Sequence, residues 1–216
     1  MKKRIVLLMA AAVLTMGMMA CGKNDTADNS TGTENNTEIN REDNSVTSTE
    51  SGTNNSAADV SSAVAVLENV WMAYGEDEKP SIMGGDAENV IDGAPGVYNI
   101  EDLDGINSYF HITADAVAMT DDAASAIHAM NANTFTSSVF HVTDAANVEA
   151  FAASVKESVL TTHWMCGFPE KLVIISVNEN YVISAFGNGD MMELFKSKVT
   201  DVYGDAAVVL AEELIE

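Results

Sequence analysis

The stretch LVIISVNENYVISAF, residues 172–186, decides the fold. Two runs rich in Val and Ile, 172–177 and 181–186, flank the turn-forming residues 178–180. β-Branched and aromatic side chains favour strands, and a short turn between two such runs joins them antiparallel. The stretch therefore predicts an antiparallel β-hairpin.

Before this hairpin the sequence predicts a strand and then a helix. The strand covers 134–142, and Thr143-Asp144 follows it as a helix cap. Apolar residues then recur at helical spacing to about His163, and Pro169 prevents continuation. The preceding segment, Ala123 to Met130, allows two interpretations. It is either a short helix or the first arm of a second hairpin that turns in an Asn-rich segment, and the tolerance of Asn for turn conformations favours the hairpin.

Amphipathic patterns also predict helices near both ends of this region. One begins at Asp190 and ends at Gly204, and a final one, capped by Asp205, covers the apolar positions of 208–215. Near the start of the region, Asp59 precedes a helical pattern over 60–74.

The segment 76–107 is rich in Gly, Asp and Pro and predicts a loop with one or two edge strands. Hairpins and helices grouped in this way favour the α+β class. We therefore expect one domain, 59–216, with a mostly antiparallel sheet and helices packed on one face.

The first residues predict export. Lys2, Lys3 and Arg4 precede an uncharged apolar run that ends at Ala20, which is the pattern of a signal peptide and is short for a bilayer span. Ala20-Cys21 resembles the lipobox of bacterial lipoproteins. That resemblance implies that the signal 1–20 is removed and that Cys21 is acylated, with the protein on the outer face of the cytoplasmic membrane.

Residues 21–58 are dominated by Ser, Thr, Asn, Asp and Gly and predict a disordered tether, because they cannot bury enough apolar surface to offset ordering. From Asp59 onward, 26 acidic residues stand against five Lys, a formal charge of −21. This charge argues against nucleic acid as a partner, since phosphate binding needs a cationic face.

Few residues suggest a catalytic or metal-binding role. His163 and Cys166 lie close enough in sequence to form an activated thiol, although packing at a helix end explains them more simply. The remaining His residues, His111, His128 and His141, lack ligand spacing, so we expect no cofactor and no metal. Glu101 to Gly105 resembles a calcium loop, but Ile100 and His111 occupy positions that need acidic ligands. A solvated acidic loop explains these residues more simply, and the alternative is a weaker oxygen site that involves Asp86, Glu88 or Asp92.

The run SSVFHVTDAANVEAFAASVKESVLTTHWMCGFPEKLVIISVNENYVISAFGNGDMMELF, within about 134–200, resembles a family of small uncharacterised lipoproteins from Firmicutes. The resemblance includes Val142-Thr143-Asp144, Pro169 and Asn180-Tyr181-Val182. It implies no established activity and no functional residues.

We therefore expect a cell-surface lipoprotein that is a non-enzymatic binding module for a protein, peptide or envelope component. The predicted contact surfaces are the edge of the sheet and the segment 76–107. The alternative is a thiol-dependent hydrolase or other enzyme that uses Cys166 with a His.

Overall fold

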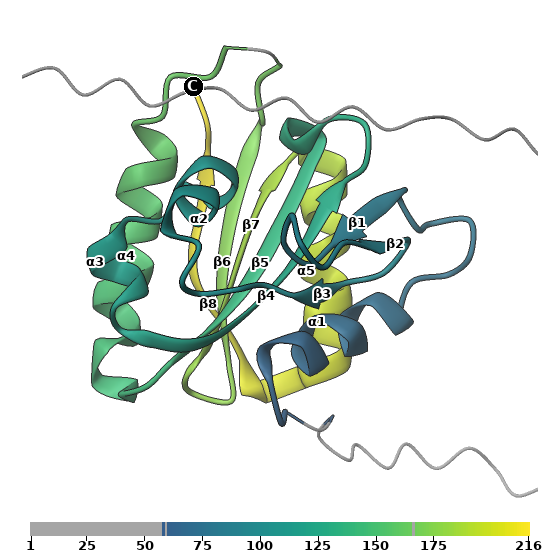
Figure 1. The fold of residues 1–216 in the computed structure, drawn as a ribbon. Coiled ribbons are helices and arrows are strands. Elements are labelled where there is room, and N and C mark those ends of the chain that lie inside the picture. Colours follow the sequence, from purple (N-terminus) through teal and green to yellow (C-terminus); the bar gives the residue numbers. More distant parts are fainter. Residues whose placement is uncertain (1–57, 59, 166) are drawn as a thin grey trace, which may run out of the picture. The chain divides into compact units, whose positions relative to one another are not determined.

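The computed structural model of the chain describes residues 58, 60–165 and 167–216 (Figure 1). The predicted signal peptide, the tether apart from Ala58, and the helix cap at Asp59 lie outside the described residues. The described strands form one antiparallel sheet with the order β2-β1-β4-β5-β7-β6-β8, and β3 pairs with β4 beside β1. The strands are β1 (Ile82–Gly84), β2 (Ile91–Asp92), β3 (Gly96–Val97), β4 (Thr120–His128), β5 (Phe135–Val142), β6 (Lys171–Val177), β7 (Tyr181–Gly187) and β8 (Ala207–Leu214).

Two hairpins form the middle of the sheet, of which the sequence predicted one outright and gave the other as the favoured of two interpretations. β6 pairs with β7 from Lys171↔Gly187 to Val177↔Tyr181. Asn178 and Glu179 have the positive φ angles of the turn, 49° and 72°. For the segment before β5, the hairpin interpretation is confirmed and the helix interpretation is wrong, because β4 pairs with β5 along most of its length.

Helices cover both faces of the sheet, and Figure 1 shows α4 and α5 on opposite sides of it. One face packs against α1 (Ala63–Met72) and α5 (Gly189–Tyr203). The other packs against α2 (Leu103–Phe110), α3 (Ala114–Val117) and α4 (Val148–Leu160). The expected helices near 60–74, 143–163 and 190–204 correspond to α1, α4 and α5.

The α+β class and the antiparallel sheet are confirmed, but the expectation that helices pack on only one face is wrong. Consecutive residues of β6 belong to opposite cores: Val173 faces α1 and α5, whereas Ile174 faces α2 and α4. Both are buried. A strand that is solvated on one face alternates apolar and polar residues, whereas a continuous apolar run is typical of a strand buried on both faces. The absence of alternation in 172–177 was the signal for two helical layers.

The predicted final helix is also wrong, because Ala207–Leu214 forms strand β8 along the outer edge of β6. The apolar positions of this segment fit both the helical spacing of about 3.6 residues and the strand alternation of two. Alternation instead sends its two glutamates to opposite faces: Glu212 pairs with Lys196 on α5 at 2.8 Å, and Glu213 pairs with Lys156 on α4 at 2.5 Å. β8 also provides hydrogen-bond partners for the backbone amide and carbonyl groups along the outer edge of β6. A helix at 207–214 would leave those groups of β6 without partners from this segment.

The segment 76–107 contains more structure than expected. It holds three short strands, β1, β2 and β3, and the first turns of α2, where the sequence predicted a loop with one or two edge strands. These strands are only two or three residues long, so the strand propensity of their residues could not distinguish them from a loop. The N-cap of α1 is Ser62, whose side chain accepts a hydrogen bond from the Ala65 amide at 3.2 Å.

Candidate binding site

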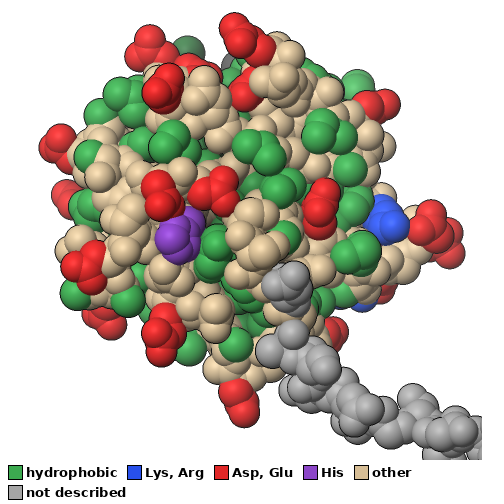
Figure 2. Space-filling view, turned by 60° about the horizontal axis from the view of Figure 1, so that its bottom comes forward, with side chains coloured by type: hydrophobic (Ala, Val, Ile, Leu, Met, Phe, Trp, Pro, Cys, Tyr) green, Lys and Arg blue, Asp and Glu red, His purple; other side chains and the backbone are tan. Residues whose placement is uncertain are grey.

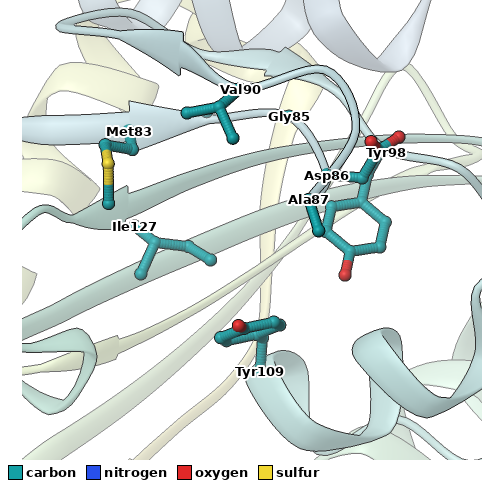
Figure 3. A pocket seen from close by; sticks show the side chains of 9 residues that line it. Met83, Gly85, Asp86, Ala87, Val90, Tyr98, Tyr109 and Ile127 are labelled. Carbon is teal, nitrogen blue, oxygen red and sulfur yellow. The ribbon is translucent and has the colours of Figure 1, made fainter. Parts of the chain in front are cut away.

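A pocket opens between the short strands, the sheet and helix α2 (Figure 3). Its volume is about 130 Å³. Its walls are mainly apolar and come from segments that are far apart in the sequence. The lining residues are Met83, Gly84, Gly85, Asp86, Ala87, Val90, Tyr98, Tyr109 and Ile127.

Two glycines allow the backbone to form this pocket. The segments around Gly84 and Gly96 cross so closely that a Cβ on Gly84 would lie 2.3 Å from the Gly96 nitrogen. A Cβ on Gly96 would lie 2.5 Å from the nitrogen of Gly85, which itself has a φ of 83°. Only glycine tolerates such an approach without displacement of the backbone. The crossing therefore fixes the loop from residue 85 to 90 that forms one wall.

Asp86 holds this loop in its turn. Its carboxylate accepts hydrogen bonds from the amides of Glu88 and Asn89, both at 2.9 Å, and from the Asn99 amide at 3.3 Å. Burial opposes ionisation of this side chain, but the hydrogen bonds outweigh it and leave the pKa of Asp86 below its ordinary value. The only carboxylate among the lining residues is therefore engaged in the structure of the loop.

The loop is also attached to the sheet, and the neighbouring Tyr98 is attached to the start of α2. Ser125 on β4 is fully buried, and its hydroxyl donates to the Gly85 carbonyl oxygen at 2.9 Å. The Tyr98 hydroxyl donates to the Asp102 carboxylate at 3.1 Å. Burial, and then the nearby Asp102 charge, raise the pKa of Tyr98, so its hydroxyl stays neutral. These contacts connect three sides of the pocket.

The mouth of the pocket exposes apolar side chains. Val90 is 58% exposed, Tyr109 48% and Met83 39%. In Figure 3 Met83 and Ile127 lie on one side of the space and Ala87 and Tyr98 on the other, with Val90 above it and the ring of Tyr109 below it. An open apolar hollow with an aromatic ring at its mouth can bind an apolar group.

A second, more polar hollow of about 340 Å³ adjoins the pocket and shares Asp86 and Ala87 with it. The other residues that line it are Glu88, Asn99 and Asp102. Asp102 is the N-cap of α2 and accepts from the Gly105 amide at 3.0 Å. Glu88 is exposed, and no ion pair of its carboxylate occurs among the described residues.

The acidic segment that resembled a calcium loop begins α2. Asp102 caps the helix and Asp104 lies in its first turn, where a negative charge interacts favourably with the helix dipole. Within residues 60–165 and 167–216, no three His, Cys, Asp or Glu side chains lie close enough together to hold a metal ion.

The histidines lie in separate places. His111 packs its ring against Trp164 and Phe186, with centroid distances of 4.7 and 5.6 Å, and burial lowers its pKa. His141 contacts Asp121 through Nδ1 at 2.5 Å and Asn180 through Nε2 at 2.6 Å.

The other two histidines do not line the pocket, although His128 follows the lining residue Ile127 at the end of β4. His128 accepts backbone hydrogen bonds in the turn after β4 through Nδ1. His163 is exposed after α4. Cys166 and the proposed lipidation residue Cys21 lie outside the described residues, so the thiol alternative stays a prediction.

Sequence reasoning included part of the pocket in the segment 76–107 and named only one of its lining residues, Asp86, and that one as a candidate cation ligand. Tyr109 and Ile127 lie beyond that segment and reach the pocket only through tertiary packing. The available signals were the Gly84-Gly85 pair and Gly96, which indicate a close backbone approach.

Comparison of the chain with protein-family models, with curated proteins and with solved structures finds no match in any of the three. None of the helices in the described part of the chain is long and apolar enough to cross a membrane.

Proposed function

We propose that this protein is a lipid-anchored, cell-surface binding module that binds a partner by accepting one apolar side chain of that partner in the pocket. The proposal combines two parts. The sequence supports the location, through the export signal and the lipobox-like Cys21. The geometry of the pocket supports the mode of binding.

The size of the pocket carries the proposal. An apolar cavity of about 150 Å³ holds one benzene molecule, and pockets for drug-sized ligands measure roughly 300–1,000 Å³. The pocket at about 130 Å³ matches a single Leu, Met or Phe side chain. A side chain that projects from a larger partner therefore fits better than a complete small molecule.

The predicted anchor and tether suit a binding module. Acyl chains on Cys21 would contribute about 0.8 kcal/mol for each buried methylene group, and two or more chains give durable anchoring. A flexible segment with the length of 21–58 has a typical span of roughly 30–36 Å. The pocket would then sample partners at a short distance from the membrane surface.

The direct test is a titration with acetyl-leucine amide, observed through the methionine methyl signals of the full domain by NMR. Burial of a Leu side chain contributes about 1.5–3 kcal/mol, so we expect a Kd on the order of 10 mM. The Met83 methyl should shift on addition of the amide. The Met72 methyl, 70% exposed on α1, is the internal control and should not shift.

The variant Ala87→Leu should fill the pocket and abolish the shift of Met83, whereas Ala150→Leu, at an exposed position of α4, should leave the shift intact. Equal shifts of Met83 and Met72, or a titration that Ala87→Leu does not alter, would reject the pocket as the binding site.

A further inference from the structure

Resting on the proposed function, we propose that the partner is a cationic polypeptide in which a Lys or Arg lies next to the apolar side chain that enters the pocket. The binding site would thus be composite. The apolar pocket accepts the apolar side chain, and the adjoining polar hollow lies under the neighbouring basic residue.

The charge around the pocket has one sign. Residues 80–110 contain six acidic side chains and no Lys, Arg or His. Asp86 and Asp102 are engaged in hydrogen bonds of the fold, as described above. Four remain exposed to solvent: Glu88, Asp92, Glu101 and Asp104.

The five lysines of the domain do not offset this charge, because each is paired with a glutamate outside residues 80–110. Lys79 pairs with Glu76, Lys198 with Glu78, and Lys156 with Glu213. Lys171 and Lys196 both pair with Glu193 and Glu212. Figure 2 shows one face of the domain, on which Asp and Glu side chains are spread widely and Lys side chains are confined to one edge. A field of this kind attracts cations and repels acidic partners.

Because the two hollows are adjacent, the basic residue of the partner should lie next to its apolar residue in the sequence. The apolar and the polar hollow share Asp86 and Ala87, so they are adjacent. Neighbouring residues of a peptide are about 3.8 Å apart at Cα. A residue beside the apolar side chain therefore reaches the polar hollow, where Glu88 offers its exposed carboxylate.

The experiment compares four capped pentapeptides with the full domain at low salt: Gly-Lys-Leu-Lys-Gly, Gly-Ser-Leu-Ser-Gly, Gly-Glu-Leu-Glu-Gly and Gly-Lys-Gly-Lys-Gly. The readout is the Met83 methyl shift. We expect the first peptide to bind about fivefold or more tightly than the second, and the third to bind most weakly among the three that contain Leu. The advantage of the first peptide should fall below about twofold at about 0.5 M salt, where screening shortens the Debye length.

The outcomes separate the two proposals. If all three Leu peptides bind equally, the pocket is confirmed and the cationic partner is rejected. If the peptide without Leu binds as tightly as Gly-Lys-Leu-Lys-Gly, and Ala87→Leu does not weaken either, binding is by charge alone and both proposals fail. If no peptide shifts Met83, the proposed function itself is rejected.

A pair of charge variants gives the matched control. Glu88→Gln with Asp92→Asn removes two exposed carboxylates near the pocket. Glu157→Gln with Asp201→Asn removes two exposed carboxylates on α4 and α5. The first pair should reduce the preference for the Lys peptide by at least about threefold and leave the Ser peptide unaffected. Equal effects of the two pairs would indicate a general charge effect and contradict a composite site.

Discussion

The hydroxyl of Ser125 on the central sheet donates a hydrogen bond of 2.9 Å to the carbonyl oxygen of Gly85 in the pocket loop. The two residues are 40 positions apart in the sequence. Because Ser125 is fully buried, removal of its hydroxyl leaves the Gly85 carbonyl without this donor. The contact therefore links the shape of the pocket to the core of the domain.

We expect Ser125→Ala to lower the free energy of unfolding by about 1–2 kcal/mol, since a buried acceptor loses its partner. Ser184 on β7 is the matched control, because its buried hydroxyl has no hydrogen-bond partner among the described residues. Ser184→Ala should be neutral or stabilising. Urea unfolding of both variants measures the difference. A larger loss for Ser184→Ala than for Ser125→Ala would contradict this account of the loop.

Gly96→Ala should disrupt the backbone crossing. The added methyl group would lie 2.5 Å from the Gly85 nitrogen and 2.9 Å from the Gly84 carbonyl carbon, and neither atom can move without displacement of the loop. We expect a loss of about 2 kcal/mol or more and loss of the Met83 response to acetyl-leucine amide. The control is Gly75→Ala, where the nearest atom, at 3.3 Å, belongs to the flexible Glu78 side chain. Equal stability of the two variants, measured by thermal unfolding, would refute the role of the crossing.

The ion pairs on β8 predict a dependence of stability on pH. Hydrogen bonds from Lys171, and then from Lys196, hold the pKa of Glu212 at about 2, below its ordinary value. A carboxylate with a lowered pKa in the folded state stabilises above its unfolded pKa of about 4.3, and this contribution is lost as the pH falls toward 2.

Glu212→Gln should therefore reduce stability at pH 7 by about 1 kcal/mol, a modest value because the side chain is partly solvated. The difference between Glu212→Gln and the parent should shrink as the pH falls from about 4.5 to 2. Urea unfolding across this range measures it. A difference that stays constant down to pH 2 would show that the ion pairs do not account for the effect of the substitution.

The proposed anchor has its own test. Mass spectrometry of the mature protein from its native membrane should find an acylated N-terminal Cys21 and no peptide that contains Met1. Cys21→Ser should leave the protein uncut or release it from the membrane fraction. A free Cys21 thiol in the mature protein would refute the anchor and leave the pocket proposal untouched.

The central hairpin was predictable because its signals are local. Residues 172–186 carry both strands and the turn in one uninterrupted stretch, and the register follows from the length of the turn. The same stretch also indicated that helices cover both faces of the sheet, because the apolar runs of β6 and β7 do not alternate with polar residues. Segment 207–214 was mispredicted because short apolar spacing fits either a helix or a strand, and the unpaired edge of β6 decided between them.

The pocket was less predictable because it depends on contacts between distant segments. Met83 and Val90 come from the short strands and their loop, Tyr109 from α2, and Ile127 from β4. Helix α2 itself escaped prediction, although Asp102 and Phe110 mark its ends. No local sequence pattern specifies where β1, the loop before β2, α2 and β4 meet. The composition of 76–107 therefore indicated an irregular segment but did not predict the pocket.

The most direct test of the central claim is an NMR measurement of contacts between Gly-Lys-Leu-Lys-Gly and the domain. The account predicts intermolecular nuclear Overhauser effects from the leucine methyl groups of the peptide to the Tyr109 ring and the Ile127 methyl groups. It also predicts that Ala87→Leu abolishes them. Contacts of the leucine methyl groups with residues outside the pocket lining, and none to Tyr109 or Ile127, would contradict the account.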